Sequence, residues 1–221
     1  INYRYADTTG KELDIDGDIV SFRRRGTSFQ PNYYRDPFTD DLLSERIYRN
    51  NTPTDINIYT AKVDYEQPFY KGKLGFGGKL TDVKTKNTFD FYNVYGTGDI
   101  KDIDRSNKFN YDENVKALYV NYNRPLSKKT TVQAGVRMEN TKSEGDLLRN
   151  NPQPDDVVKR NYTDFFPSGA ITYTVNQKNT LNLSYSRRID RPSYQNLNPF
   201  EDKLDELTYR KGNAFLNPQY T

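Results

Sequence analysis

The sequence has no cysteine and no histidine among its 221 residues. Without thiols there are no disulfides, thiolate nucleophiles or cysteine-bound zinc. Without imidazoles the commonest general base, the usual metal ligand and any histidine-containing triad are missing. The acidic pairs Asp40-Asp41 and Asp155-Asp156 offer no second group that would make a glycosidase dyad. We therefore expect no enzyme activity, no catalytic residues, no metal and no cofactor.

Long apolar runs and a strong charge of one sign are also missing. No stretch reaches the roughly 18 apolar residues of a transmembrane helix. Lys and Arg number 33 against 30 Asp and Glu, a net charge of +3, which gives nucleic-acid binding little support. A mean hydropathy of −1.01 is poor for a large dry core, yet 19 Tyr and 12 Phe argue against general disorder. This composition suits a β-barrel with a hydrated interior and aromatic girdles.

What the sequence does contain is a repeated alternation of apolar and polar residues. Side chains on a strand point to opposite faces in turn, so each run predicts a strand with one apolar face. The apolar part of each run matches the roughly 9–11 residues that cross a bilayer at a tilt. About eight strands are predicted, at 1–8, 12–20, 56–67, 73–83, 115–124, 130–141, 164–175 and 180–190.

The connections between these runs switch regularly between short and long. Tight polar turns are expected at 71–72, 127–129 and 177–179, and long loops at 23–54, 85–112 and 143–160. Loops that long are uncommon in compact domains. Outer-membrane barrels, in contrast, have short periplasmic turns and long extracellular loops. The fold class we predict is all-β, an antiparallel up-and-down meander forming part of a transmembrane barrel.

The acidic residues of the second run indicate which face is wet. Its even positions are carboxylates, which would be costly in a dry core and cost little beside a hydrated lumen. We therefore expect the apolar side of the strands to contact lipid and the polar side to line a pore. The residues concerned are Glu12, Asp14, Asp16 and Asp18 on the polar side and Val132, Val136, Ile171, Leu181 and Leu183 on the lipid side.

Five segments carry a resemblance to a known family. They are NYRYADTTGKEL at 2–13, FFPSGAITY at 165–173, LNLSYSRRIDRP at 181–192, SYQNLNPF at 193–200 and GNAFLNPQYT at 212–221. Together they resemble the TonB-dependent receptors of the outer membrane, in the Bacteroidota-type outer-membrane β-barrel family. The resemblance implies a barrel of about 22 strands, of which residues 1–221 would be a partial barrel domain. A plug domain and a TonB-contacting box would lie N-terminal to Ile1.

The same resemblance implies a function and a location. Such a receptor sits in the cell outer membrane of a Gram-negative bacterium and takes up a scarce solute, such as a siderophore, vitamin, glycan or peptide. Its partners would be outer-membrane lipid and lipopolysaccharide, its own plug, the TonB system and the small solute, with no nucleic acid. Two alternatives remain open: a secreted soluble β-sandwich or carbohydrate-binding module, and a structural or adhesive barrel without transport.

The candidate substrate-binding residues are Arg187, Arg188 and Arg191, the densest cationic group. Arginine forks suit carboxylate or phosphate groups, and many siderophores are anionic. The alternative is that these arginines pair with acids of adjacent strands or of the plug. A second cationic run, 23–25, would bind lipopolysaccharide phosphates, if anything.

Other features are open to two interpretations. Asp14, Asp16 and Asp18 around Gly17 depart from the calcium-loop spacing and favour lumen-facing acids. Asp99, Asp102 and Asp104 could bind Ca²⁺, although a solvated loop is the default. Aromatic residues of the expected loops would stack on a ligand or pack the loops together. They are Tyr33, Tyr34, Phe38, Phe89, Phe91, Tyr92 and Tyr95. A short helix is expected at 201–209, no strand is expected to return within the last loop, 191–218, and residues 218–221 indicate the beginning of the next strand.

Overall fold

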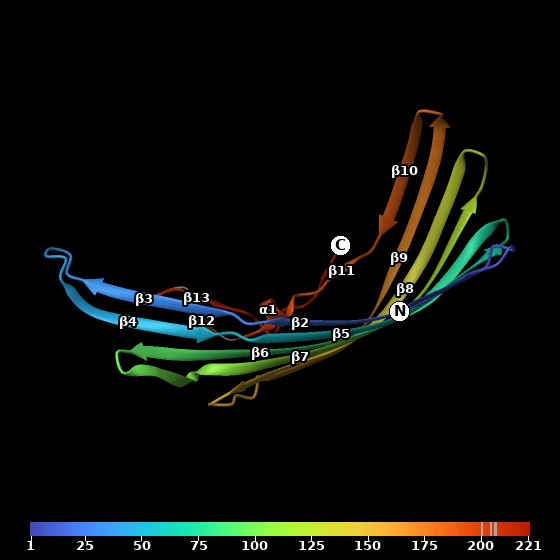
Figure 1. Ribbon diagram of the computed structural model, residues 1–221. Coiled ribbons are helices and arrows are strands. Elements are labelled where there is room, and N and C mark those ends of the chain that lie inside the picture. Colours follow the sequence, from blue (N-terminus) through green and yellow to red (C-terminus); the bar gives the residue numbers. More distant parts are fainter. Residues whose placement is uncertain (200, 204, 206) are drawn as a thin grey trace.

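The computed structural model describes every residue of the chain except 200, 204 and 206 (Figure 1). Ten strands form one antiparallel sheet, with β1, β2, β5, β6, β7, β8, β9 and β10 hydrogen-bonded in that order. The hairpin of β3 and β4 joins this sheet through β6. The strands are β1 (Asn2–Ala6), β2 (Glu12–Arg24), β3 (Thr27–Arg35), β4 (Leu42–Asn51), β5 (Thr54–Phe69), β6 (Gly72–Tyr95), β7 (Gly98–Pro125), β8 (Thr130–Arg149), β9 (Val157–Asn176) and β10 (Asn179–Ser186).

The sheet is a single curved layer whose edges do not meet, so it forms an open trough (Figure 1). The chain after β10 runs back over the concave side. In the described part of the chain, the only other sheets are two small strand pairs, so no second large sheet packs on the first. This arrangement does not favour the soluble β-sandwich. No helix among the described residues has the length and hydropathy to cross a membrane.

The predicted apolar face is continuous across the strands because their registers align. Apolar residues of successive strands are direct cross-strand partners, and many of them are exposed. Val136, Ile171, Leu181 and Leu183, for example, are 42%, 49%, 63% and 73% exposed. We call this surface the apolar band. One cross-strand row of it consists of Ile15, Val63, Gly78, Leu118, Met138 and Phe165.

The opposite, concave face is polar, as the carboxylates of β2 predicted. Tyr119 of β7 donates a hydrogen bond of 2.5 Å to Asp64 Oδ1 of β5 across the intervening β6. That reach is possible because β6 has Gly77 between them, where an added Cβ would lie 2.8 Å from the Tyr119 ring. On β1, Arg4 pairs with Glu12 at 2.7 Å. The polar face is therefore tied together by hydrogen bonds and ion pairs between strands.

The three long loops predicted from the sequence are wrong. Residues 27–35 and 42–51 form the β3–β4 hairpin, while β6 and β7 continue as strands of 24 and 28 residues joined by a short turn. Strands β8 and β9 likewise extend, leaving residues 150–156 as their connection. Asp, Asn and Gly disfavour strands intrinsically, but cross-strand hydrogen bonding and side-chain packing override that preference here. We call these parts of the strands the extensions.

The alternation of apolar residues changes phase where the apolar band ends and the extensions begin. In β6 the exposed apolar residues are the even-numbered Phe76 and Leu80, whereas the buried ones are the odd-numbered Phe89 and Phe91. Apolar side chains therefore point outward in the band and toward the concave side in the extensions. Most of the buried core lies in the extensions and the chain that covers them. Its hydrophobic members are Tyr48, Phe89, Phe91, Phe109, Tyr111, Leu147 and Leu197, together with Ala117 and Phe166 at its border.

The chain after β10, residues 187–221, folds over the concave side, and we call it the C-terminal segment. Its strand β11 (Ile189–Asp190) pairs with β14 (Gln219–Tyr220), so a short strand does lie within residues 218–221. Between them lie α1 (Tyr194–Leu197) and the pair β12 (Glu201–Lys203) and β13 (Tyr209–Lys211).

The helix predicted at 201–209 is wrong, with positions 204 and 206 lying outside the described residues. Asp205 instead accepts hydrogen bonds of 2.7 Å from the backbone N–H groups of Leu207 and Thr208, which closes a hairpin turn. The helix occurs earlier, where Ser193 caps α1 by accepting from the Asn196 backbone N–H. Such local side-chain hydrogen bonds are the reason Asp favours turns and Ser favours N-caps.

Candidate functional site

The C-terminal segment is held to the polar face by an arginine in the RRIDRP motif. Arg191 donates hydrogen bonds to Glu139 Oε2 at 2.6 Å and to Thr141 Oγ1 at 3.0 Å, both on β8. Glu139 is only 7% exposed and also pairs with Arg137. A carboxylate this buried needs its cations, because an unpaired buried charge is very costly. The ion pair therefore fixes the beginning of the segment against the sheet.

A second anchor fixes both ends of the segment to β9. The Tyr220 hydroxyl donates to Asp164 Oδ2 at 2.8 Å, and Arg187 lies 3.7 Å from the same carboxylate. The Arg187 guanidinium also lies 4.5 Å from the centre of the Tyr220 ring, a cation–π contact. Further along, Arg160 donates to the carbonyl of Ala214 at 2.6 Å.

These contacts show where the three candidate arginines lie. Arg187 and Arg191 both pair with acids of neighbouring strands, as the structural alternative expects. Arg188 is exposed; its Nε donates to Ser186 Oγ at 3.3 Å. Arg187 and Arg191 therefore lie on the polar face of the sheet, whereas the Arg188 side chain is exposed to solvent. A substrate-binding role for them stays a prediction.

The helix α1 packs on the extensions through a small apolar cluster. Leu197, 4% exposed, contacts Phe109, Tyr111 and Leu147, and Tyr194 packs against the same group. Burial raises the pKa of the Tyr111 hydroxyl, and Glu113, to which it donates at 2.8 Å, raises it further. This cluster fixes the position of α1 against the concave face.

A polar cavity lies beside this cluster, and we call it the inner cavity. Its floor is a cross-strand row of Arg24, Thr54 and Asn87, which are direct register partners on β2, β5 and β6. The same row continues into Phe109 and Leu147, on which α1 sits. The inner cavity measures about 680 Å³. Its remaining lining comes from the C-terminal segment and β4–β5: Thr52, Tyr194, Gln195, Asn196, Asn198, Arg210, Lys211, Gly212, Asn213 and Leu216.

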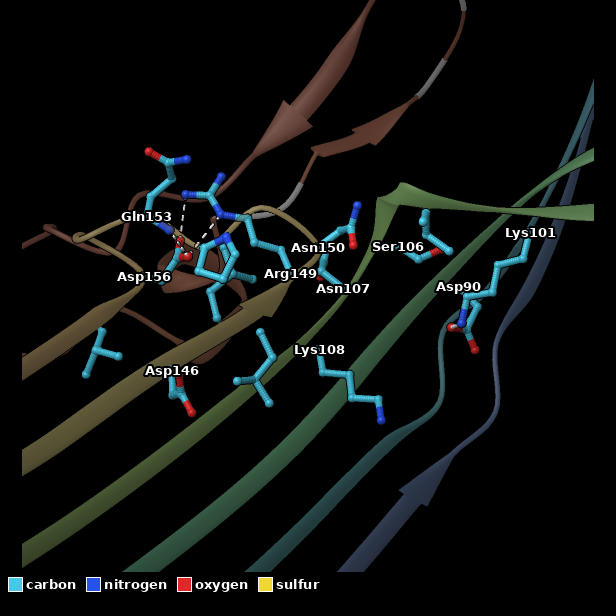
Figure 2. A pocket seen from close by; sticks show the side chains of 15 residues that line it. Asp90, Lys101, Ser106, Asn107, Lys108, Asp146, Arg149, Asn150, Gln153 and Asp156 are labelled. Atoms are coloured by element: carbon cyan, nitrogen blue, oxygen red, sulfur yellow. Dashed lines mark hydrogen bonds and ion pairs between the residues drawn. The ribbon is translucent and has the colours of Figure 1, made fainter.

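A second cavity of about 550 Å³ opens at the ends of the extensions (Figure 2). Its wall on one side is the connection between β8 and β9, where Arg149 pairs with Asp156 at 2.6 Å. Burial favours the neutral form of Asp156, yet the hydrogen bonds from Arg149 and from the Gln153 backbone N–H lower its pKa below the usual value. On the other side, Asp90 and Lys101 form an ion pair across β6 and β7. Two of the acids that line this second cavity, Asp90 and Asp156, are therefore already paired with cations of its wall.

The carboxylates considered for calcium are dispersed among separate partners. Asp99 pairs with Arg49, Asp102 lies 3.7 Å from Arg105, and Asp104 accepts from Asn150 at 2.7 Å. No group of three or more acidic side chains suited to a metal occurs in the described ranges of the chain.

The aromatic residues of the expected loops divide into two sets. Phe89 and Phe91 are 1% exposed and pack with Tyr48, which belongs to the same cluster although the sequence did not single it out. In contrast, Tyr33, Phe38 and Tyr95 are 56%, 94% and 57% exposed. The phase reversal of the apolar alternation is the sequence signal that would have separated the buried residues from the exposed ones.

A sheet with an exposed apolar band outside and a polar, charged concave face is part of the wall of an outer-membrane β-barrel. The comparison with protein families agrees, because the Outer membrane protein beta-barrel family matches residues 4–221. The chain belongs to this family and lies in the outer membrane of a Gram-negative cell. No curated protein matches the sequence significantly. No solved structure matches it either.

The membrane location explains the two directions of the apolar side chains. The apolar band contacts lipid, and the tight turns beside it lie on the periplasmic side. The extensions project to the extracellular side, where water surrounds both faces and apolar residues gather under the C-terminal segment instead. Both cavities therefore lie at the extracellular end of the barrel wall.

Proposed function

We propose that the chain is the barrel portion of a TonB-dependent receptor that takes up a scarce solute. In this function, the apolar band contacts lipid and lipopolysaccharide, and the polar face contacts a plug domain. The extensions and the C-terminal segment capture the solute from outside. Energy transmitted by the TonB system then shifts the plug and admits the solute.

The observation that carries this proposal is the inward fold of the C-terminal segment. A purely structural barrel needs only a closed wall, whereas here a stretch bearing the receptor-like motifs is fixed onto the lumen side. Arg191 and Tyr220, both within those motifs, make its contacts to Glu139 and Asp164. The segment covers part of the concave face and lines the inner cavity, in which we expect the solute to bind.

Growth under limitation tests the proposal. A strain lacking the gene is grown in media in which iron, cobalamin, a glycan or a peptide is the limiting nutrient and must cross the outer membrane. We expect a growth defect on one solute class, and the same defect in a strain lacking the TonB system. Normal growth of the deletion strain on every class, together with no plug-sized domain encoded upstream of Ile1, would instead identify a structural or adhesive barrel.

A further inference from the structure

The inner cavity has the charge of an anion-binding site. Three cationic residues line it, Arg24 from β2 and Arg210 and Lys211 from β13, and the described lining residues include no carboxylate. Lys211 does have a nearby acid, since its Nζ lies 3.3 Å from Glu201, but that pair is exposed at the rim. Arginine and lysine bind carboxylates and phosphates by charge-assisted hydrogen bonds.

The floor of the inner cavity also has a buried acceptor. Asn87 is 9% exposed; its amide nitrogen donates to Thr54 Oγ1 at 3.1 Å, while its Oδ1 has no hydrogen-bond partner among the described residues. Buried polar atoms are nearly always hydrogen-bonded, so an orphaned carbonyl oxygen beside a cavity calls for a donor. A ligand hydroxyl would supply one.

The wall opposite the floor is rich in amides and is rigidly placed. Gly212 and Asn213 donate backbone hydrogen bonds to the carbonyls of Asn198 and Asn196 at 3.0 and 2.7 Å. A Cβ at Gly212 would lie 2.2 Å from the Asn198 carbonyl oxygen, so the turn requires glycine. The backbone contact holds β13, and with it Arg210 and Lys211, against α1.

We propose that the inner cavity binds a hydroxylated anion of the acidic-sugar class, with the carboxylate at Arg24 and Lys211 and a hydroxyl at Asn87. The volume of about 680 Å³ lies within the usual range for small-ligand sites. This inference rests on the proposed function, because it names the substrate class of the same receptor. It assigns the floor residues a role that neither the motifs nor the candidate arginines indicated.

Binding to the full-length protein in detergent tests the inference with three probes. They are a galacturonic-acid trisaccharide, the neutral maltotriose, and tricarballylate, a tricarboxylate without hydroxyl groups. Titration calorimetry should show the trisaccharide acid binding more tightly than either of the others. Arg24→Gln should lower the affinity for the galacturonic-acid trisaccharide by about tenfold or more, as expected for the loss of a charge-assisted hydrogen bond. Lys211→Gln removes the other cation proposed to contact the carboxylate, at the rim of the cavity, and should also lower the affinity for the acid.

Two further variants separate the contributions. Asn87→Ala should lower the affinity for the acidic trisaccharide and leave the affinity for tricarballylate unchanged, because only the sugar offers a hydroxyl. Arg23→Gln is the matched control: Arg23 neighbours Arg24 but points to the other face, where it pairs with Asp55 at 3.0 Å. The Arg23→Gln variant should bind the acidic trisaccharide with the same affinity as the natural protein. Heat-modifiable migration in gels shows that each variant is folded.

The outcomes distinguish this inference from the proposed function. The acidic-sugar site is overturned if maltotriose binds as tightly as the galacturonic-acid trisaccharide. It is also overturned if Arg24→Gln and Lys211→Gln both leave the affinity for that trisaccharide unchanged. An absence of binding by the folded protein, as when the plug fills the cavity, overturns it as well. TonB-dependent uptake of a neutral solute would then leave the transport function standing. Tight acid binding without TonB-dependent uptake would retain the site and refute transport.

Discussion

At the scale of single residues, Arg191 is the contact that holds the C-terminal segment to the barrel wall. Removing its guanidinium leaves Glu139 with Arg137 as its remaining cation. We expect Arg191→Gln to cost about 1–3 kcal/mol of local stability, as for a hydrogen bond to a charged group. Hydrogen exchange across residues 191–221 of the full-length protein measures this loss as faster exchange.

The control for this change is Arg188→Gln, because the Arg188 side chain is exposed and its one hydrogen bond within the described part of the chain is to Ser186. Its exchange rates should match those of the natural protein. A double variant with Glu139→Gln should cost less than the sum of the two single changes, since the pair acts as a unit. Additive costs would show that the ion pair does not hold the segment.

Asp156 makes the connection between β8 and β9 sensitive to pH. Its folded-state pKa lies below the ordinary value of about 3.9. The stabilisation is therefore present above that ordinary value and is lost as the pH falls through the folded pKa. Exchange protection of the Gln153 backbone amide, which donates to Asp156 at 2.6 Å, should fall in this acidic range. Asp156→Asn should remove the dependence; its persistence in that variant would assign it to another group.

At the scale of elements, the turn at Gly212 fixes β13 against α1. The added methyl of Gly212→Ala meets backbone atoms, which cannot swing away as a side chain could. We expect a cost of about 1–3 kcal/mol, typical of overpacking, and loss of exchange protection at the Asn213 amide. Gly96→Ala is the control, because a Cβ there meets nothing within 4 Å. Equal effects of the two variants would contradict the tight packing.

The length of the strands also belongs to this scale. The beginnings of the strands near the periplasmic turns follow from period-two alternation, and the structure confirms them. The extensions were missed because Asp, Asn and Gly within 85–112 and 143–160 favour turns when taken alone. Their strand conformation comes from hydrogen bonding to neighbours, for which a single stretch of sequence gives little signal. The helix at 201–209 failed for the opposite reason, since a local Asp205 turn overrode the helical pattern.

At the scale of the whole molecule, the apolar band must face hydrocarbon. A charge placed on it is therefore costly, whereas the same charge on the polar face meets water. Val136→Arg should destabilise the full-length protein by about 2–4 kcal/mol in phospholipid vesicles, as at the bilayer midplane. Gln133→Arg, on the polar face of the same strand, is the control and should cost far less. Urea unfolding in vesicles measures both, and equal costs would reverse the assignment of the faces.

The sequence by itself determined the two faces of the sheet, because side chains alternate with period two whatever the neighbours of a strand. It also determined the antiparallel meander, since tight polar turns join successive strands. Only the tertiary structure decided where the C-terminal segment lies. The partners of Arg191 and Tyr220 are Glu139 and Asp164, about fifty residues away along the chain. The inner cavity likewise exists only because the register of three strands brings Arg24, Thr54 and Asn87 into one row beneath that segment.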